Sequence, residues 1–214
     1  MKDIPAFVTE NGVAALSLQQ IPYTGFAHIT IYSSMALIEF LGECVGFCRA
    51  AGAEWILACG QAELEKFPVY TRILSMQMPM PESKEQACLF PVTEQTVDEW
   101  LAVYNNAMKD VPNASFLSKQ MGKSILQKNS AYFVHDDGEL LGIGVVENDT
   151  ILAIASCKKG AGERVMHTLC GALSGDFVKL EVAENNIPAM RLYKRMGFVV
   201  TGVKNTWYDA TKKV

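Results

Sequence analysis

The chain has 214 residues, of which 50% are hydrophobic and 20% are charged, a composition that supplies a sizeable apolar core and excludes a largely disordered protein. Its net charge is −4 and it has no block of basic residues, so no nucleic-acid or anionic membrane surface is expected. No apolar run reaches the roughly 20 residues that span a bilayer. The first residues, MKDIPAFVTENG, lack the basic-then-apolar layout of a signal peptide, so a cytoplasmic protein is expected.

The cysteine and histidine content favours a reduced protein without a metal site. The six cysteines form no C-x-x-C pair, and only three histidines accompany them. Small buried thiols in a reducing compartment explain this pattern better than a disulfide framework or a metal centre. We therefore expect no metal cofactor.

The first 80 residues are predicted to hold one strand–helix–strand unit. Its strands are 28–34 and 54–60, and its helix is 36–52. Residues 64–76 correspond in order to a second helix, which contains Tyr70. The prolines and charges of PMPESKEQ then predict a linker at 81–86, between a first part over 1–80 and a domain over 87–214.

The domain over 87–214 alternates between strands and helices. Its predicted elements are a strand at 87–92, helices at 96–110 and 115–128 with Ser115 as a cap, a hairpin over 130–149 that turns at Asp136-Asp137-Gly138, a strand at 150–156 buried on both faces, a helix after residues 157–163, a strand at 177–184, a helix within 184–198, and two closing strands, 198–203 and 205–209. This order predicts a mixed α/β (α+β) fold whose central sheet is mostly antiparallel, with a parallel pair in its middle and helices on its faces.

The two parts share a spacing. The strand starts lie 26 residues apart in the first part (28 to 54) and 27 apart in the second (150 to 177). This near-equality indicates that the first part is a partial repeat of the same unit.

The segment CKKGAGE, residues 157–163, is a glycine-bearing turn between a strand and a helix. Gly160 and Gly162 permit close backbone approach, and their N–H groups join those at the start of the helix. Lys158 and Lys159 add positive charge. The pattern is compatible with a phosphate-binding loop and equally with a packing turn.

The segment ENNIPAMRLYKRMGF, residues 184–198, predicts a capped amphipathic helix. Asn185 or Asn186 can cap its start, Pro188 suits its first turn and Gly197 its end. Tyr193 lies on the apolar face, where it is either an ordinary core residue or a residue that takes part in chemistry.

Taken together, the two segments resemble the GCN5-related N-acetyltransferase (GNAT) family over roughly residues 87 to 214. The match follows a strand that reads LEV and consists of Asn186-x-x-Ala189-x-x-Leu192-Tyr193-x-Arg195-x-Gly197-Phe198. The resemblance implies a GNAT-type sheet whose diverging central strands take acetyl-CoA. One departure from the family is Cys157, which stands where the loop usually begins with Arg or Gln.

The resemblance also implies roles for individual residues. The strand before the loop, Ile154, Ala155 and Ser156, would pair with the pantetheine arm. Asn186 would contact the cofactor, with Ala189 beside it, and Tyr193 would protonate the departing thiolate, since tyrosine keeps its proton at neutral pH. The loop amides would hold the pyrophosphate, at Lys159, Gly160, Ala161, Gly162 and Glu163.

The resemblance implies acetyl transfer from acetyl-CoA to a primary amine of a small-molecule or amino-acid-like acceptor by direct attack. The alternative is a non-catalytic acyl-CoA-binding or regulatory protein on the same fold. Glu147, Asp149 and Glu181 lie near the right strands for a general base, although each is also explained as a solvated charge. Three roles are open to the first part, which lacks the glycine loop: extending the sheet, shaping the acceptor pocket, or pairing subunits into a homodimer.

Overall fold

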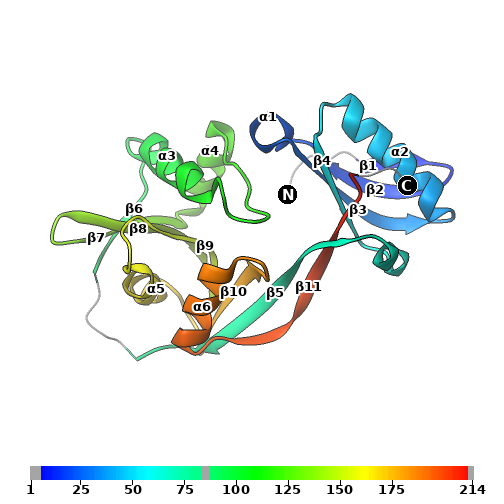
Figure 1. The fold of residues 1–214 in the computed structure, drawn as a ribbon. Coiled ribbons are helices and arrows are strands. Elements are labelled where there is room, and N and C mark those ends of the chain that lie inside the picture. Colours follow the sequence, from blue (N-terminus) through cyan, green and yellow to red (C-terminus); the bar gives the residue numbers. More distant parts are fainter. Residues whose placement is uncertain (1–5, 83–86, 212–214) are drawn as a thin grey trace. The chain divides into compact units, whose positions relative to one another are not determined.

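The computed structural model describes residues 6–82 and 87–211 and contains one mixed sheet, with strand order β1-β2-β3-β4-β11-β5-β10-β9-β8-β7-β6 (Figure 1). Contacts divide the chain into two compact units. Unit 1 comprises residues 1–73 and 203–214, and unit 2 comprises residues 74–202. The mixed α/β class and the mostly antiparallel sheet predicted from the sequence are confirmed.

Unit 1 begins with a hairpin that the sequence analysis did not predict. Its elements are β1 (Ala6–Thr9), β2 (Gly12–Ser17), the single turn α1 (Ile21–Thr24), β3 (Phe26–Ser34), α2 (Leu37–Ala50), β4 (Trp55–Cys59) and a 3₁₀ turn (Ala62–Lys66). Strands β3 and β4 are parallel and stay paired over five residues, from Phe26 opposite Trp55 to Thr30 opposite Cys59. Helix α2 covers one face of these strands, and Phe40 and Leu41 of α2 are fully buried there (Figure 1).

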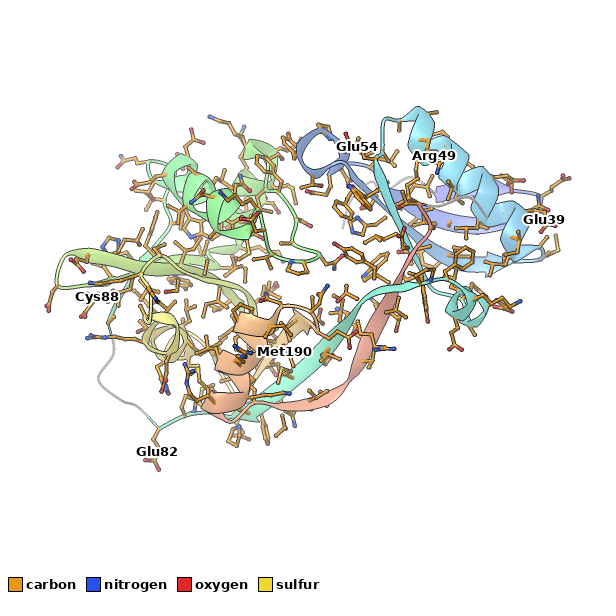
Figure 2. All side chains as sticks on the ribbon, viewed as in Figure 1. Glu39, Arg49, Glu54, Glu82, Cys88 and Met190 are labelled. Atoms are coloured by element: carbon orange, nitrogen blue, oxygen red, sulfur yellow. The ribbon has the colours of Figure 1, made fainter. Side chains whose placement is uncertain are left out.

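The last residues of the described chain pack with unit 1. The side chain of Arg49, at the end of α2 (Figure 2), donates a hydrogen bond to the carbonyl of Thr211. The hydroxyl of Thr211 accepts the N–H of Ile56 at 3.0 Å. These contacts explain why residues at both ends of the sequence belong to one compact unit.

Helix α2 offers a simple test of its packing. Gly46 lies in the helix interior, and a Cβ built there would meet no other heavy atom within 4 Å. Because alanine loses less backbone entropy than glycine in a helix, we expect Gly46→Ala to stabilise the protein by about 0.5–1 kcal/mol. Thermal unfolding should show a rise of about 1–4 °C. A fall in melting temperature would mean that this face of α2 is covered.

The described part of unit 2 contains five complete strands and four helices. They are β6 (Cys88–Pro91), α3 (Val97–Met108), α4 (Lys119–Lys128), β7 (Ala131–Asp136), β8 (Glu139–Glu147), β9 (Thr150–Ser156), α5 (Gly162–Cys170), β10 (Phe177–Ala183) and α6 (Ile187–Met196). Helices α5 and α6 pack on one face of the sheet and α3 and α4 on the other, each pair over its own apolar cluster (Figure 1). Strands β9 and β10 form the parallel pair that the sequence predicted.

Two long strands contribute residues to both units. They are β5 (Val69–Pro79) and β11 (Val199–Asp209). The predicted helix over 64–76 is therefore wrong, because most of it lies in β5, where its β-branched residues suit a strand between β10 and β11. The predicted strands 198–203 and 205–209 are one continuous strand.

Two further details differ from the prediction. Ser118, and not Ser115, caps α4, since its hydroxyl accepts the N–H of Met121 at 3.4 Å. Strand β9 is not buried on both faces, because Leu152 is 56% exposed. The turn of the β7–β8 hairpin at Asp137-Gly138 is confirmed, with both residues at positive φ.

Four residues of the predicted linker at 81–86 lie outside the described residues. The boundaries 1–80 and 87–214, and the partial repeat, stay predictions. In the described part of the chain, no helix has the length and apolar character that a bilayer span requires.

Candidate functional site

Strands β9 and β10 diverge soon after they meet. They pair at only two positions, Lys179 opposite Thr150 and Leu180 opposite Ile151. Just beyond these positions the β8–β9 register skips Leu152, because Val145 faces Ala153 while the next residue, Val146, faces Ile151. A bulge of this kind bends its strand and ends regular pairing. Residues 152–156 therefore leave β10 and expose one edge of β9.

The exposed edge of β9 carries unpaired main-chain groups. The N–H of Cys157 donates to the carbonyl of Leu141 on β8 at 2.8 Å. Since the direction of main-chain groups alternates along a strand, Ala155 also turns toward β8, and Ile154 and Ser156 turn toward the side that β10 has left. An extended ligand with amide groups can bind along this edge as an added strand.

The loop after β9 leads directly into the N-terminus of α5. Gly160 has φ +85°, a left-handed conformation that favours glycine, and no atom lies within 4 Å of the position of a Cβ there. The N–H of Ala161 donates to the carbonyl of Lys158 at 3.1 Å, so this amide, one of the five predicted phosphate donors, is used inside the loop. The first helical bond runs from Val165 to Ala161 at 2.9 Å. The N–H groups of Gly162 and Glu163 precede it and remain open to an anion.

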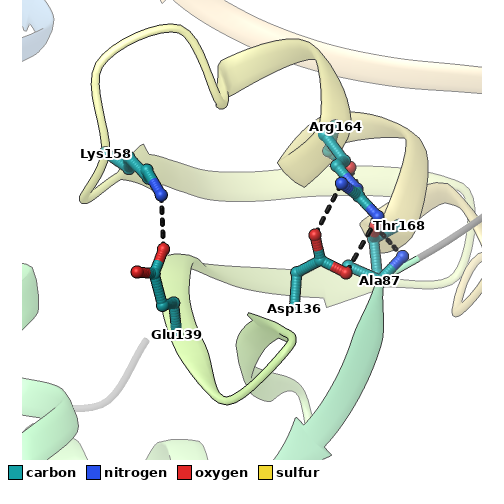
Figure 3. Close-up of polar contacts among 6 residues, drawn as sticks. All are labelled: Ala87, Asp136, Glu139, Lys158, Arg164 and Thr168. Atoms are coloured by element: carbon teal, nitrogen blue, oxygen red, sulfur yellow. Dashed lines mark hydrogen bonds and ion pairs between the residues drawn. The ribbon is translucent and has the colours of Figure 1, made fainter.

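Ion pairs connect the loop and α5 to the β7–β8 turn (Figure 3). The ammonium of Lys158 contacts the carboxylate of Glu139, which raises the pKa of Lys158 and lowers that of Glu139 through their hydrogen bond. The guanidinium of Arg164 donates to Asp136 at 2.8 Å through Nη2 and lies 2.5 Å from its other oxygen through Nη1. Lys159 is exposed and pairs with no described residue. It is thus the cation of the loop that remains for a ligand.

The sequence analysis predicted neither these ion pairs nor the close packing of α5 on β8. The partners are 19 and 28 residues apart, and no spacing rule connects them. The close packing of α5 did have a signal, the two glycines within β8, which reads ELLGIGVVE. A Cβ on Gly144 would lie 2.4 Å from Cδ1 of Leu169, and one on Gly142 would lie 2.8 Å from a methyl of Val165. Glycine at these positions lets α5, and the loop before it, approach β8.

Helix α6 begins and ends as its sequence predicts. The side-chain oxygen of Asn186 accepts the N–H of Ala189 at 3.3 Å, so Asn186 and not Asn185 is the cap. Gly197 closes the helix with φ +97°. The oxygen of Asn186 is occupied by this cap, which leaves its amide nitrogen for the predicted cofactor contact.

Tyr193 is nearly buried on α6. It is 7% exposed and packs on Phe198, with 5.6 Å between the ring centroids. Burial raises the pKa of Tyr193 to about 12, so the phenol stays protonated at neutral pH. Among residues 6–82 and 87–211, only Oε2 of Glu43 is a fully buried side-chain oxygen without a partner. The Tyr193 hydroxyl bonds no described residue either, and it therefore keeps contact with solvent.

Helix α6 lies against the start of α5. A Cβ on Gly162 would meet Cδ2 of Leu192 at 3.0 Å. The carboxylate of Glu163 lies 3.7 Å from Nε of Arg195. The structure thus brings Tyr193's helix next to the open amides at the N-terminus of α5.

Two of the candidate bases lie at the other end of β9. Glu147 pairs with Lys128 at 3.1 Å, and Asp149 pairs with Lys179 at 2.6 Å. Both precede β9, whose seven residues place them about 20 Å from the loop. The third, Glu181, is an exposed residue of β10. Burial raises the pKa of the Cys157 thiol, which disfavours the thiolate that a nucleophile requires.

In the part of the chain that the structure describes, this site has no metal cluster beside it, and the parallel strand pair of unit 1 does not open in the same way. Within residues 6–82 and 87–211, no group of three or more metal-ligating side chains occurs. In unit 1, the parallel strands β3 and β4 stay paired over five residues, and the N-cap of α2 is Ala36 rather than a glycine loop. The features for anion and strand-like binding therefore coincide in unit 2.

No protein-family model matches the sequence, and no curated protein matches it. Solved structures match over nearly the whole chain. A GNAT-family acetyltransferase from Colwellia psychrerythraea gives a TM-score of 0.57 at 10% identity, covering 95% of this chain and 84% of its own. A GCN5-related N-acetyltransferase from Kribbella flavida gives 0.55 at 13% identity, covering 97% and 90%. A protein of unknown function from Staphylococcus epidermidis gives 0.61 at 14% identity, covering 97% and 95%.

These identities show the fold alone. The chain has the fold of the GNAT acetyltransferases, which confirms the resemblance seen in the sequence at the level of the fold. The likeness extends beyond residues 87–214 and includes the first part of the chain.

Proposed function

We propose that this chain, which has the GNAT fold, is an N-acetyltransferase that moves an acetyl group from acetyl-CoA to a primary amine of a small molecule. The divergence of β9 and β10 beside the N-terminus of α5 carries this proposal. It combines an open strand edge, suited to an amide-bearing arm, with open amides suited to phosphate. A packing turn alone would not require the neighbouring strands to separate.

The residues along this opening fit the parts of acetyl-CoA. Ile154 and Ser156 would pair with the pantetheine arm through their main-chain groups. The amides of Gly162 and Glu163 would hold the pyrophosphate, with Lys159 supplying positive charge. The thioester supplies the activated acetyl group.

Tyr193 is the proposed general acid. The amine nitrogen forms the new bond to the acetyl carbon as the carbon–sulfur bond breaks, and the Tyr193 hydroxyl gives its proton to the departing sulfur. The attacking nitrogen loses one proton, to water or to Glu181 of β10; Glu147 and Asp149 are held by lysines at the far end of β9.

The alternative is a protein that binds acyl-CoA without catalysis. Three features favour it: Cys157 replaces the basic or amide residue that begins the family's loop, the Ala161 amide is used within the turn, and Glu139 neutralises Lys158. Binding and turnover must therefore be measured separately.

Thermal unfolding with acetyl-CoA tests the binding half of the proposal. At about 100 times its dissociation constant, acetyl-CoA should stabilise the protein by about 2.7 kcal/mol. The melting temperature should rise by about 5–10 °C. S-acetylpantetheine, which lacks the phosphates, should give a smaller rise. No shift with saturating acetyl-CoA would refute both the enzyme and the binding-protein alternative.

Thiol release tests the catalytic half. Free coenzyme A should appear faster with an effective member of a primary-amine panel than without amine. Acetyl-CoA binding without amine-dependent thiol release would support the non-catalytic alternative.

A further inference from the structure

The face of unit 1 opposite α2 is lined by aromatic side chains. Along β3, Ala27, Ile29 and Ile31 point toward α2 and are at most 1% exposed. Because side chains alternate along a strand, Phe26 and His28 lie on the other face. This alternation separates the aliphatic core of unit 1 from a second, chemically different surface.

Ring contacts join five side chains on this second surface, which we call the aromatic face: Phe26, His28, Trp55, Tyr70 and Trp207. Phe26 lies 6.1 Å from Trp55 and 5.9 Å from Tyr70, measured between ring centroids. His28 lies 6.2 Å from Phe26 and 5.0 Å from Trp207. Trp55 is 48% exposed, so part of the aromatic face is open to solvent.

The aromatic face also carries a carboxylate. In the antiparallel pair of β11 and β4, Asp209 lies opposite Leu57, and residues directly opposite one another share a face. Leu57 belongs to the cluster beneath the aromatic face, with Trp207 and Tyr70. The N–H of Asp209 donates to the carbonyl of Pro68, two residues before Tyr70, at 2.8 Å. Burial, and then the charge of Asp209, raise the pKa of Tyr70, which agrees with this placement.

A hydrogen bond at the end of β11 holds the carboxylate of Asp209 in place. Its Oδ1 accepts the N–H of Thr211 at 2.8 Å. An asparagine at this position can accept the same hydrogen bond, so the charge of Asp209 can be removed without removing the contact.

We propose that the aromatic face, together with Asp209, binds an organic ammonium ion. The face of an aromatic ring carries negative electrostatic potential, and the carboxylate adds a full negative charge. The combination attracts a cation with an apolar body, repels an anion, and gives a neutral ligand no charge to pair with the carboxylate. A small molecule with a primary ammonium group satisfies both parts of the surface. The site belongs to unit 1 alone and goes beyond the acyl transfer proposed for unit 2.

Tryptophan fluorescence of the full chain tests this proposal, since Trp55 and Trp207 both lie on the aromatic face. Benzylammonium at neutral pH should change the fluorescence saturably. Benzyl alcohol, its neutral counterpart of similar shape, should bind about tenfold more weakly. Asp209→Asn should weaken benzylammonium by about tenfold and leave benzyl alcohol unchanged, which removes the preference for charge.

Glu39→Gln is the matched control. It removes a carboxylate from unit 1 at the start of α2 (Figure 2), on the helix that covers the opposite face, and it should bind benzylammonium as the unaltered chain does. Equal binding of the two probes, an unchanged preference in Asp209→Asn, or no saturable change would each overturn the proposal. The assay needs neither acetyl-CoA nor turnover, so its result is independent of the function proposed for unit 2.

Discussion

Tyr193→Phe is expected to lower amine-dependent turnover at least tenfold while nearly preserving acetyl-CoA affinity. The substitution removes only the hydroxyl, so the packing on Phe198 and the helix caps are retained. A loss confined to turnover corresponds to about 1.4 kcal/mol or more of transition-state stabilisation. Steady-state kinetics, together with thermal shifts by acetyl-CoA, separate the two effects.

Tyr132→Phe provides the matched control, because Tyr132 is a half-buried tyrosine of unit 2 whose hydroxyl donates to the carbonyl of Asn129. Its turnover should be nearly unchanged. The pH profile gives a second check: since the pKa of Tyr193 is about 12, its proton is present at all lower pH values, and Tyr193 should cause no loss of rate below about pH 10. Unchanged turnover in Tyr193→Phe would show that Tyr193 is an ordinary core residue and not the general acid.

The sequence predicted the local parts of the candidate site well, because their signals lie within a few residues. Asn186, Pro188 and Gly197 define the start and end of α6 by rules that need no tertiary information. The same holds for the hairpin turn at Asp137-Gly138 and for the glycine loop. The helical spacing of Tyr193 could not distinguish core from chemistry, and its burial and solvent contact are compatible with both.

The parts that the sequence did not predict depend on partners far along the chain. The apolar spacing of residues 64–76 suits a helix as well as a strand, so the sequence alone predicts a helix there. Most of the segment is strand β5 because β10 and β11 pair with it, and both lie far along the chain. The opening of β9 depends on a one-residue bulge at Leu152, which leaves no pattern in the sequence. The pairs of Lys158 with Glu139 and of Arg164 with Asp136 exist only because the hairpin folds beside the loop.

Gly142 is a local signal in the sequence, a glycine within a strand, whose reason lies in the distant elements β9 and α5. It should be the glycine of unit 2 that is most sensitive to an added methyl group. A Cβ at this position would lie 2.4 Å from the carbonyl oxygen of Ala155 and 2.8 Å from Val165. The first contact is with the backbone of β9 and the second with a side chain that is 0% exposed, so neither neighbour can move away without a loss of stability. We expect Gly142→Ala to destabilise the protein by about 2–3 kcal/mol, a loss of about 5–10 °C in melting temperature.

The same substitution should weaken acetyl-CoA binding, because relief of the clash must move β9 or α5, the two elements proposed to hold the cofactor. Gly202→Ala is the control: it also adds a methyl group to a strand, but no atom lies within 4 Å of the position of its Cβ. Its stability should stay the same or rise by up to about 1 kcal/mol, as alanine loses less backbone entropy than glycine, and its acetyl-CoA affinity, measured well below the melting temperature, should match that of the unaltered chain. If Gly142→Ala lost stability but bound acetyl-CoA normally, the seat of α5 on β8 would matter for folding alone, and the cofactor would have to be held elsewhere.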